Sequence, residues 1–256
     1  MKTKIAINGF GRIGRNLFRL LLNHPTIEVV AINDVADTKT MAHLLKYDSI
    51  HGVLPYKVSA DEKGILVEQD HFLFFHEKDI SNLPWKSFSI DYVIEATGKY
   101  KTFEELNAHI VAGAKKVILS APSEVDSIKT VVIGVNDHIL DGTETIISNA
   151  SCTTNNAAPM MKVIDELCGI KQAYITTIHS YTTDQSLHDQ PHKDLRRARG
   201  ASQSIVPTTT GAAKALTKIF PTLDGKIGGC GIRVPVPDGS LTDITFNVKR
   251  AVTINE

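Results

Sequence analysis

The chain has 256 residues, of which 42% are hydrophobic and 22% charged, so it is long enough for two domains with substantial cores. Lys and Arg together number 28, as do Asp and Glu, and this zero net charge argues against nucleic acid or an anionic membrane as a partner. The N-terminus lacks a signal-peptide pattern and no apolar run reaches membrane length, so we expect a cytoplasmic protein that acts on small molecules.

A glycine-rich turn follows the first predicted strand. Lys4–Asn8 is a short apolar run, Gly9–Gly14 fits GxGxxG, and leucines at helical spacing follow. A second predicted strand, Glu28–Asn33, ends in Asp34. The glycines let a pyrophosphate approach a helix N-terminus, and Asp34 can accept from a ribose hydroxyl while repelling a 2′-phosphate. The pattern predicts a unit that binds NAD rather than NADP; the alternative is an ordinary glycine-rich turn with Asp34 capping a loop.

The alternation of strands and helices continues with one interruption, and we place a domain boundary near residue 150. Thr97, Gly98 and Ser120 lie at the C-terminal ends of predicted strands, the sheet edge that binds ligands in open α/β folds, although turn residues of these types are also common without a ligand. The predicted helices are Thr38–Lys46 and Phe103–Gly113, and the predicted strands are Val53–Ser59 and Gly64–Glu68 as a hairpin, Phe72–His76, Tyr92–Ala96, Lys116–Ser120, Thr130–Gly134 and Thr145–Ser148.

A turn of small residues, SNASCTTNNAAP at Ser148–Pro159, carries Cys152 into a helical pattern that ends near Leu167. The N–H groups and the dipole at a helix N-terminus stabilise a thiolate, which makes a cysteine nucleophilic near neutral pH. Neighbours such as Ser151 and Thr153 are good capping and anion-contacting types. The alternative is that Cys152 is a small buried hydrophobe in a capped turn.

The two other cysteines, Cys168 and Cys230, are far from Cys152 and from one another, and no CxxC pair is present. This spacing argues against a disulfide framework and a structural metal site.

After the Cys152 helix the pattern changes. Ala173–His179 is a predicted strand that ends in His179, a position where a lone histidine is most often structural. A long polar loop, Ser180–Pro207, carries three arginines that indicate a solvated face or an interface. The remaining predictions are a helix opened by Thr208–Gly211, strands Ile232–Pro237 and Asp243–Arg250, and a helix start at the capping-box pattern Thr253–Glu256.

Together these segments resemble phosphorylating glyceraldehyde-3-phosphate dehydrogenase over the whole chain. The motifs that carry the resemblance are INGFGRIGR, AINDVADTKTMAHLLKYDSIHG, EATG, SNASCTTN, IHSYT, HKDLRRARGASQSIVPTTTGAAKA and RVPVPDGSLTD. The resemblance implies a Rossmann-type doubly wound NAD-binding domain over residues 1–150 and an α+β catalytic domain with a mixed sheet over residues 151–256. It also implies a homotetramer, with the Ser180–Pro207 loop near the subunit centre.

The reaction implied by the resemblance converts glyceraldehyde 3-phosphate, NAD and inorganic phosphate into 1,3-bisphosphoglycerate and NADH. Cys152 would be the nucleophile that forms a hemithioacetal and then a thioester, and His179 would be its base. By match to the family's motifs, the cofactor contacts would be Gly9, Phe10, Gly11, Arg12, Ile13, Gly14, Asp34, Lys78, Thr97, Gly98 and Ser120. The phosphate groups would be held by Ser151, Thr153, Thr182, Arg197, Thr210, Gly211 and Arg233, and no metal is expected.

The sequence departs from the family pattern in three places. Asn156 replaces a common cysteine or small residue, and Asp238-Gly239 replaces the commoner Asn-Val, which we expect to alter a turn. Family chains continue past Glu256, so the catalytic domain is expected to be incomplete. Two alternatives therefore stay open: erythrose-4-phosphate dehydrogenase, whose acyl-enzyme is released by water, and a non-catalytic NAD-binding fragment.

Overall fold

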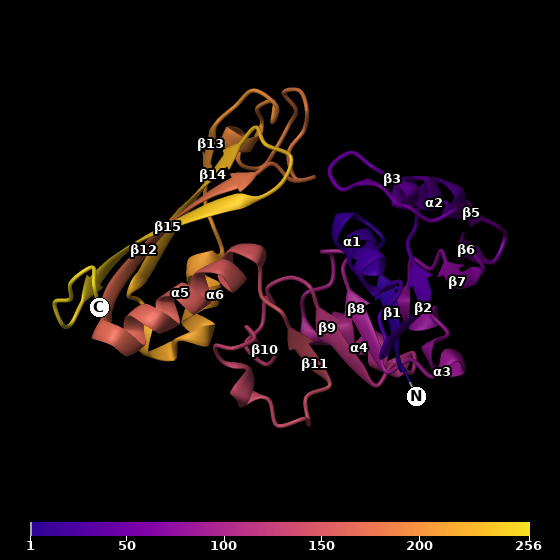
Figure 1. The fold of residues 1–256 in the computed structure, drawn as a ribbon, viewed down its shortest axis with the longest axis horizontal. Helices are drawn as coiled ribbons and strands as arrows, with labels where there is room; N and C mark the ends of the chain where they lie inside the picture. Colours follow the sequence, from indigo (N-terminus) through magenta and orange to yellow (C-terminus); the bar gives the residue numbers. More distant parts are fainter. Residues whose placement is uncertain (1) are drawn as a thin grey trace. The chain divides into compact units, whose positions relative to one another are not determined.

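The first strand of the chain lies inside a nine-stranded sheet in the computed structural model, which describes residues 2–256 (Figure 1). The strand order is β10-β11-β9-β8-β1-β2-β7-β6-β5, and every pair from β10 to β7 is parallel. The strands that come next in the chain, β2 and β5–β7, lie on one side of β1 (Thr3–Asn8). The later strands β8–β11 lie on its other side, so the topology switches at β1. Ligands bind at such a switch, outside the carboxyl ends of the strands. The predicted Rossmann-type sheet is confirmed.

The chain divides into two compact units. The first contains the residues up to Thr130 and Leu140–Asn149, and the second contains Val131–Ile139 and Ala150–Glu256. The first unit holds the strands β2 (Ile27–Asn33), β3 (Tyr47–Asp48), β4 (Gly52–Val53), β5 (Val58–Ala60), β6 (Gly64–Val67), β7 (Asp70–Phe75), β8 (Tyr92–Glu95), β9 (Lys116–Leu119), β10 (Lys129–Thr130) and β11 (Ile146–Ser148), and the helices α1 (Arg12–Leu21), α2 (Thr38–Lys46), α3 (Trp85–Phe88) and α4 (Phe103–Val111) with the short 3-10 turn Ile80–Asn82.

Two sequence expectations in the first unit need correction. The predicted strand Val53–Ser59 is two short strands, β4 and β5, separated by residues 54–57, and Pro55 within that gap cannot donate a ladder hydrogen bond. The predicted strand Thr130–Gly134 ends at Thr130, because Gly134 adopts a φ of 78° in a turn. The hairpin is confirmed, with Val58 opposite Val67. Helix α3 had no counterpart among the predicted elements.

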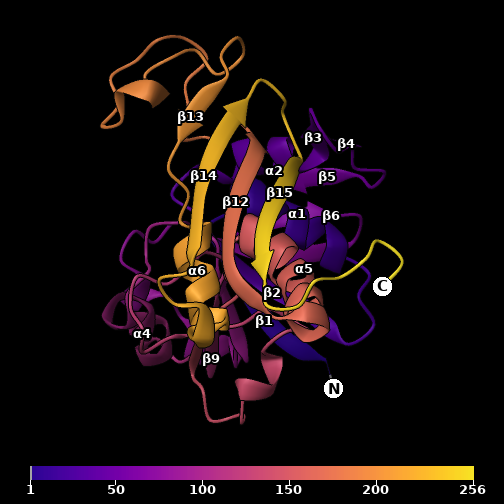
Figure 2. The same cartoon turned by 90° about the vertical axis from the view of Figure 1, so that its left-hand side faces the viewer.

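The second unit is built on a mixed four-stranded sheet of order β13-β14-β12-β15. Only β14 and β12 are parallel. Figure 2 shows the four strands side by side, with helices α5 and α6 against one face of the sheet. There α5 packs on β15 and α6 packs on β14. The elements are α5 (Cys152–Cys168), β12 (Ile170–Ser180), β13 (Val206–Thr208), α6 (Ala212–Ile219), β14 (Ile227–Val234) and β15 (Ser240–Val248), with 3-10 turns at Asp137–Ile139, Leu195–Arg197 and Pro221–Leu223.

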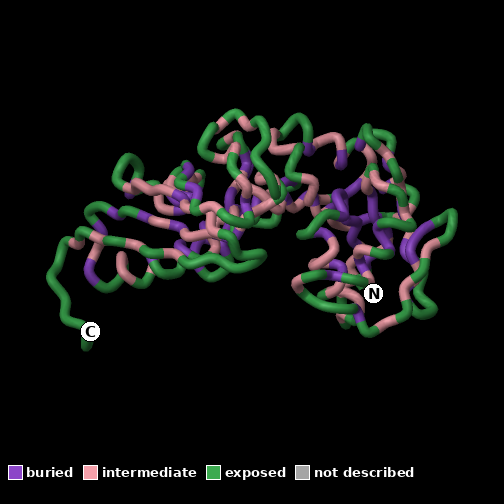
Figure 3. The backbone as a smooth tube through the Cα atoms, turned by 90° about the horizontal axis from the view of Figure 1, so that it is seen from above, coloured by how far each residue is buried: buried purple, intermediate pink, exposed green. Residues whose placement is uncertain are grey.

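The closing strands begin earlier than the sequence pattern indicates. The predicted strand Ile232–Pro237 is β14, which starts at Ile227, because glycines at its start hide the alternation that marks a strand. The predicted strand Asp243–Arg250 is β15, which starts at Ser240. Thr253–Glu256 forms a turn rather than a helix, although the Glu256 carboxylate accepts a hydrogen bond from Thr253 N, as in half of a capping box. Figure 3 shows residues 251–256 exposed throughout.

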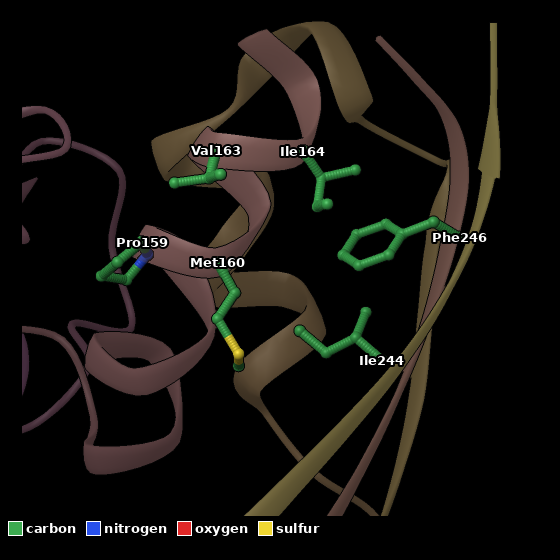
Figure 4. Close-up of a pocket in the computed structure, with 6 residues that line it drawn as sticks. All are labelled: Pro159, Met160, Val163, Ile164, Ile244 and Phe246. Carbon is green, nitrogen blue, oxygen red and sulfur yellow. The ribbon is translucent and has the colours of Figure 1, made fainter. Parts of the chain in front are cut away.

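An apolar groove lies between α5 and β15, on the helix-covered face of the second sheet (Figure 4). Its volume is about 510 Å³. In Figure 4 the Ile164 side chain of α5 and the Phe246 ring of β15 point toward one another across it. The other lining residues are Pro159, Met160, Val163 and Ile244, and the groove includes none of the predicted catalytic residues.

Candidate active site

The turn before α5 presents Cys152 at the start of the helix. Ala150 has a φ of 57°, in the left-handed region that costs free energy for a residue with a side chain. Ser151 then adopts an extended conformation and caps the helix, since its hydroxyl accepts from Thr154 N at 3.2 Å. Cys152 is therefore the first residue of a 17-residue helix, and it is exposed. The helix dipole favours negative charge on its sulfur.

His179 lies next to this sulfur. It is near the carboxyl end of β12, and its Nε2 is 3.2 Å from Cys152 Sγ. The hydrogen bond to His179 lowers the pKa of the Cys152 thiol, against the opposing effect of partial desolvation by the protein atoms around the sulfur. The same bond raises the pKa of His179. Both shifts favour a thiolate and an imidazolium as an ion pair.

Arg233 lies on the other side of the imidazole. In the parallel pair of β12 and β14, His179 is in register with Arg233, which brings the two side chains together. Arg233 Nη1 is 2.7 Å from His179 Nδ1 and 3.0 Å from Ser180 O. His179 Nδ1 is also 2.8 Å from Ser180 O, so this carbonyl can accept from both groups. Burial, followed by the charge of Arg197, lowers the pKa of Arg233.

The other residues predicted to hold phosphate groups lie on several elements of the second unit. Ser151 and Thr153 flank Cys152, and Thr210 and Gly211 precede the first turn of α6, where a helix dipole favours an anion. Arg197 forms an ion pair with Asp184 and donates from Nε to the Thr208 hydroxyl at 2.7 Å. Thr182 follows β12, and its N–H donates to Gln185 Oε1 at 3.3 Å.

The glycine-rich turn after β1 requires glycine at two positions, because a larger side chain would meet backbone atoms there. Gly9 has a φ of 93°, and a Cβ there would lie 2.6 Å from Thr97 N. A Cβ on Gly14 would lie 2.1 Å from Gly9 O. Gly11, in contrast, has nothing within 4 Å of its Cβ position, so the turn is open where a pyrophosphate would approach. These features fit the predicted NAD.

Asp34 and Phe10 stabilise the same turn. The Asp34 carboxylate accepts from Phe10 N at 2.7 Å and from Ala36 N at 3.0 Å. The Phe10 ring is fully buried and packs edge-on against Phe18. The predicted ribose acceptor therefore also holds the turn in place.

The remaining predicted cofactor residues lie at or beside the same edge of the first sheet. Arg12 begins α1 and forms an ion pair with Asp48. Although burial opposes it, hydrogen bonds from His51 and Ile50, together with Arg12, lower the pKa of Asp48 to about 2. Ile13 is 54% exposed. Thr97 and Gly98 follow β8, Ser120 follows β9, and Lys78 follows β7 and is exposed.

A group of buried polar residues beneath this edge was not predicted from the sequence. Asn8, Asn33, Glu95 and His109 are each at most 3% exposed, and Asp48 was not recognised as the partner of Arg12. A detectable signal existed for Glu95, because a carboxylate at the end of an otherwise apolar parallel strand must find partners when it is buried.

The arginine loop and the sequence departures also have structural explanations. Arg196 forms an ion pair with Asp194, and Arg199 forms one with Asp189. Asn156 lies exposed on α5. Gly239 has a φ of 83°, which favours glycine in the turn between β14 and β15. Its carbonyl accepts from Ser180 N at 3.1 Å, so this turn supports the strand end that carries His179.

Within residues 2–256, no group of three or more His, Cys, Asp or Glu side chains is arranged to hold a metal ion. No helix in this range is both long and apolar enough to cross a membrane.

Comparison with known proteins gives one family for both halves of the chain. Residues 3–103 match the family model described as glyceraldehyde 3-phosphate dehydrogenase, NAD binding domain, and residues 151–256 match that of the C-terminal domain. The chain is 50% identical over 257 residues to glyceraldehyde-3-phosphate dehydrogenase of Geobacillus stearothermophilus, covering 100% of this chain and 76% of the relative. It is 51% identical to glyceraldehyde-3-phosphate dehydrogenase 2 of Bacillus subtilis (strain 168), covering 100% and 75%. The chain therefore belongs to the glyceraldehyde-3-phosphate dehydrogenase family.

Proposed function

We propose that Cys152 and His179 carry out the family's reaction in this chain, which is an NAD-dependent oxidoreductase. The reaction, a step of glycolysis, converts glyceraldehyde 3-phosphate and inorganic phosphate into 1,3-bisphosphoglycerate. The observation that supports the two residues most is the 3.2 Å separation of Cys152 Sγ and His179 Nε2 at the first turn of α5. A nucleophile within hydrogen-bond reach of its base is the arrangement that covalent catalysis requires.

In the proposed mechanism the Cys152 thiolate attacks the aldehyde carbon. The carbonyl oxygen takes the proton of His179 Nε2, which gives a hemithioacetal. His179 Nε2 then removes that hydroxyl proton as the carbon loses a hydride, and the carbonyl of a thioester forms. NAD, when bound, supplies the hydride acceptor. A phosphate oxygen finally attacks the thioester carbon, and Cys152 leaves as a thiolate.

Two anion-binding groups serve this mechanism. Thr182 and Arg233 would hold the phosphate of the substrate, and the contact of Arg233 with His179 Nδ1 at 2.7 Å couples that group to the base. Ser151, Thr153, Thr210 and Gly211 would hold the attacking phosphate at the helix N-termini. Arg197 would add its fork of donors to one or both anions.

The cofactor would lie on the glycine-rich turn of the first unit. Gly9, Gly11 and Gly14 would admit the pyrophosphate, and Asp34 would accept from the adenosine ribose and disfavour NADP. The remaining proposed contacts are Phe10, Arg12, Ile13, Lys78, Thr97, Gly98 and Ser120.

At a coarser level we propose a cofactor domain over residues 1–150, a catalytic domain over residues 151–256, a cytoplasmic location and a homotetramer. The tetramer is supported by the loop at residues 180–207, where Leu187, Leu195 and Ile205 are 69%, 81% and 71% exposed. We propose that another copy of the chain covers these three side chains.

The test is formation of NADH by the chain with NAD, glyceraldehyde 3-phosphate and phosphate. We expect steady turnover with phosphate, and at most one NADH for each active site without it, because the thioester then accumulates. Cys152→Ser should abolish both phases, whereas Cys230→Ser should leave them intact. Equal steady rates with and without phosphate would contradict phosphorolysis, and a parallel assay with erythrose 4-phosphate identifies the preferred sugar phosphate.

A further inference from the structure

A buried polar cluster lies directly beneath the proposed cofactor edge of the first sheet. The Glu95 cluster comprises Asn8 at the end of β1, Asn33 at the end of β2, Glu95 at the end of β8, and His109 on α4 with Trp85 on α3. Glu95, His109 and Trp85 have no exposed surface, and the two asparagines are 1% and 3% exposed. Burying a carboxylate is costly unless it is fully hydrogen-bonded, so the partners of Glu95 decide what this cluster does.

Every hydrogen-bonding neighbour of the Glu95 carboxylate donates to it. Its Oε2 accepts from Asn8 Nδ2 at 2.5 Å and from His109 Nε2 at 3.1 Å. Its Oε1 accepts from Thr97 N at 2.8 Å and from the Thr97 hydroxyl. Four donors suit an ionised carboxylate, which has only acceptor sites.

The orientation of His109 is fixed from its other side. Trp85 Nε1, which can only donate, lies 3.0 Å from His109 Nδ1. Nδ1 must therefore accept, and the proton of the neutral ring is on Nε2, where it is donated to Glu95. Helices α3 and α4 thus hold the carboxylate at one position.

The cluster reaches three strand ends that carry proposed cofactor contacts. Asn33 Nδ2 donates to Asn8 Oδ1 at 2.8 Å, and Asn33 Oδ1 accepts from Glu77 N at 2.8 Å. Gly9 follows Asn8 and Asp34 follows Asn33 in the sequence. The backbone of Thr97 packs directly on Gly9: a Cβ at Gly9 would lie only 2.6 Å from Thr97 N. A single carboxylate therefore links the ends of β1, β2 and β8.

We propose that Glu95 is a positioning residue for the cofactor: through Asn8, Asn33 and Thr97 it fixes the edge that binds NAD, without touching NAD itself. This inference rests on the proposed cofactor contacts at Gly9, Asp34 and Thr97. A binding edge that is already ordered loses less conformational entropy when its ligand binds. Loss of the Glu95 carboxylate should therefore weaken the affinity of the folded protein for NAD.

Glu95→Gln, with Asp91→Asn as a matched control, tests this inference. In Glu95→Gln an amide N–H₂ replaces one oxygen, so at least one pair of donors must face each other. Asp91 is a carboxylate at the opposite end of the same strands, where it accepts from Lys4 N at 2.8 Å and from Lys115 Nζ at 2.7 Å. Calorimetric titration with NAD should show a dissociation constant about tenfold or more higher for Glu95→Gln and within about twofold of wild type for Asp91→Asn.

The titration separates positioning from simple stability. A structural role would lower the binding stoichiometry and leave the dissociation constant unchanged. Unchanged affinity in Glu95→Gln, or equal losses in the two variants, overturns the inference. Should Glu95→Gln fail to fold, Trp85→Phe decides, because it removes the donor to His109 and keeps an aromatic ring at this buried position: a loss of about threefold in affinity supports the inference and no loss overturns it.

Asp34→Ala distinguishes failure of this inference from failure of the proposed cofactor site. If Asp34→Ala weakens NAD binding and Glu95→Gln does not, the proposed cofactor contact stands and only the inference fails. If the wild-type chain does not bind NAD, the proposed cofactor site and the inference both fail.

Discussion

At the scale of single residues, the second unit brings together the proposed nucleophile, the proposed base and a guanidinium group. Cys152 is set by a capped turn, His179 by the end of a long strand, and Arg233 by register with His179. Arg233 opposes protonation of the imidazole, while Cys152 favours it. We infer that withdrawal of Arg233 toward a substrate phosphate would strengthen the thiolate-imidazolium pair.

The ionisation of Cys152 predicts its reactivity with iodoacetamide. Because its pKa is lowered, the thiolate persists as the pH falls below the ordinary range near 8.5, and the raised pKa of His179 keeps the imidazolium as the pH rises above about 6.5. In His179→Gln the hydrogen bond from an imidazolium is lost, so we expect alkylation of Cys152 at pH 7 to slow by about tenfold.

Labelling rates read by mass spectrometry across the pH range provide the measurement. Cys168, which is buried, and Cys230, which is partly buried, serve as internal references in the same protein. A rate for Cys152 that rises only near pH 8.5, as for an unperturbed thiol, would show that the pairing does not activate it.

At the scale of elements, turns determine what each site can do. The turn after β1 combines a left-handed Gly9 with a Gly14 that packs on its carbonyl, so the helix and the strand approach closely. The turn before α5 uses a left-handed Ala150 and the Ser151 cap to place Cys152. Each turn is local in sequence, which is why its motif was recognisable.

Gly14→Ala and Gly11→Ala separate stability from cofactor binding. A Cβ at Gly14 meets the Gly9 carbonyl at 2.1 Å, so we expect the free energy of unfolding to fall by about 2 kcal/mol or more. A Cβ at Gly11 meets nothing within 4 Å, so stability should change by less than about 1 kcal/mol while NAD affinity falls. Urea unfolding and NAD titration measure the two effects, and equal losses of stability would refute the distinction.

At the scale of the whole molecule, family membership covers both units of the chain. The first unit has the mainly parallel sheet with its switch at β1. The second has the mixed sheet, with His179 on β12 and Cys152 at the start of helix α5. The proposed assembly of four copies rests on the exposed apolar residues of one loop, Leu187, Leu195 and Ile205.

The oligomeric state can be tested at the apolar loop. In sedimentation velocity we expect the wild-type chain to have four times the mass of a single chain of 28.0 kDa. Leu195→Lys places a charge where an apolar contact is proposed and should shift the distribution to smaller species. Val111, which is 73% exposed at the end of α4 in the first unit, provides the control Val111→Lys, which should leave the mass unchanged. A monomeric wild-type chain would contradict the tetramer.

Much of the architecture could be predicted because it depends on local patterns. Helix α2 lies at the predicted bounds Thr38–Lys46, and the glycine motif, the cysteine turn and the alternation of strands and helices indicated the fold class and the family that the comparisons confirm. Predictions failed where local signals are weak, as in the glycine-rich start of β14 and the short strands around Pro55.

Sequence by itself therefore determined the family, the fold class and the cofactor, because these depend on motifs whose residues are neighbours in the chain. Only the tertiary structure decided which distant groups meet. The contact of His179 with Arg233 follows from the register of β12 and β14, and that of Asn8 with Glu95 joins residues 87 positions apart. Strand order and register are set by packing of the whole sheet, and a shift of one residue would turn each side chain to the opposite face. In the sequence, Glu95 is therefore a single charged residue with no visible partner. In the fold, its carboxylate links the ends of three strands.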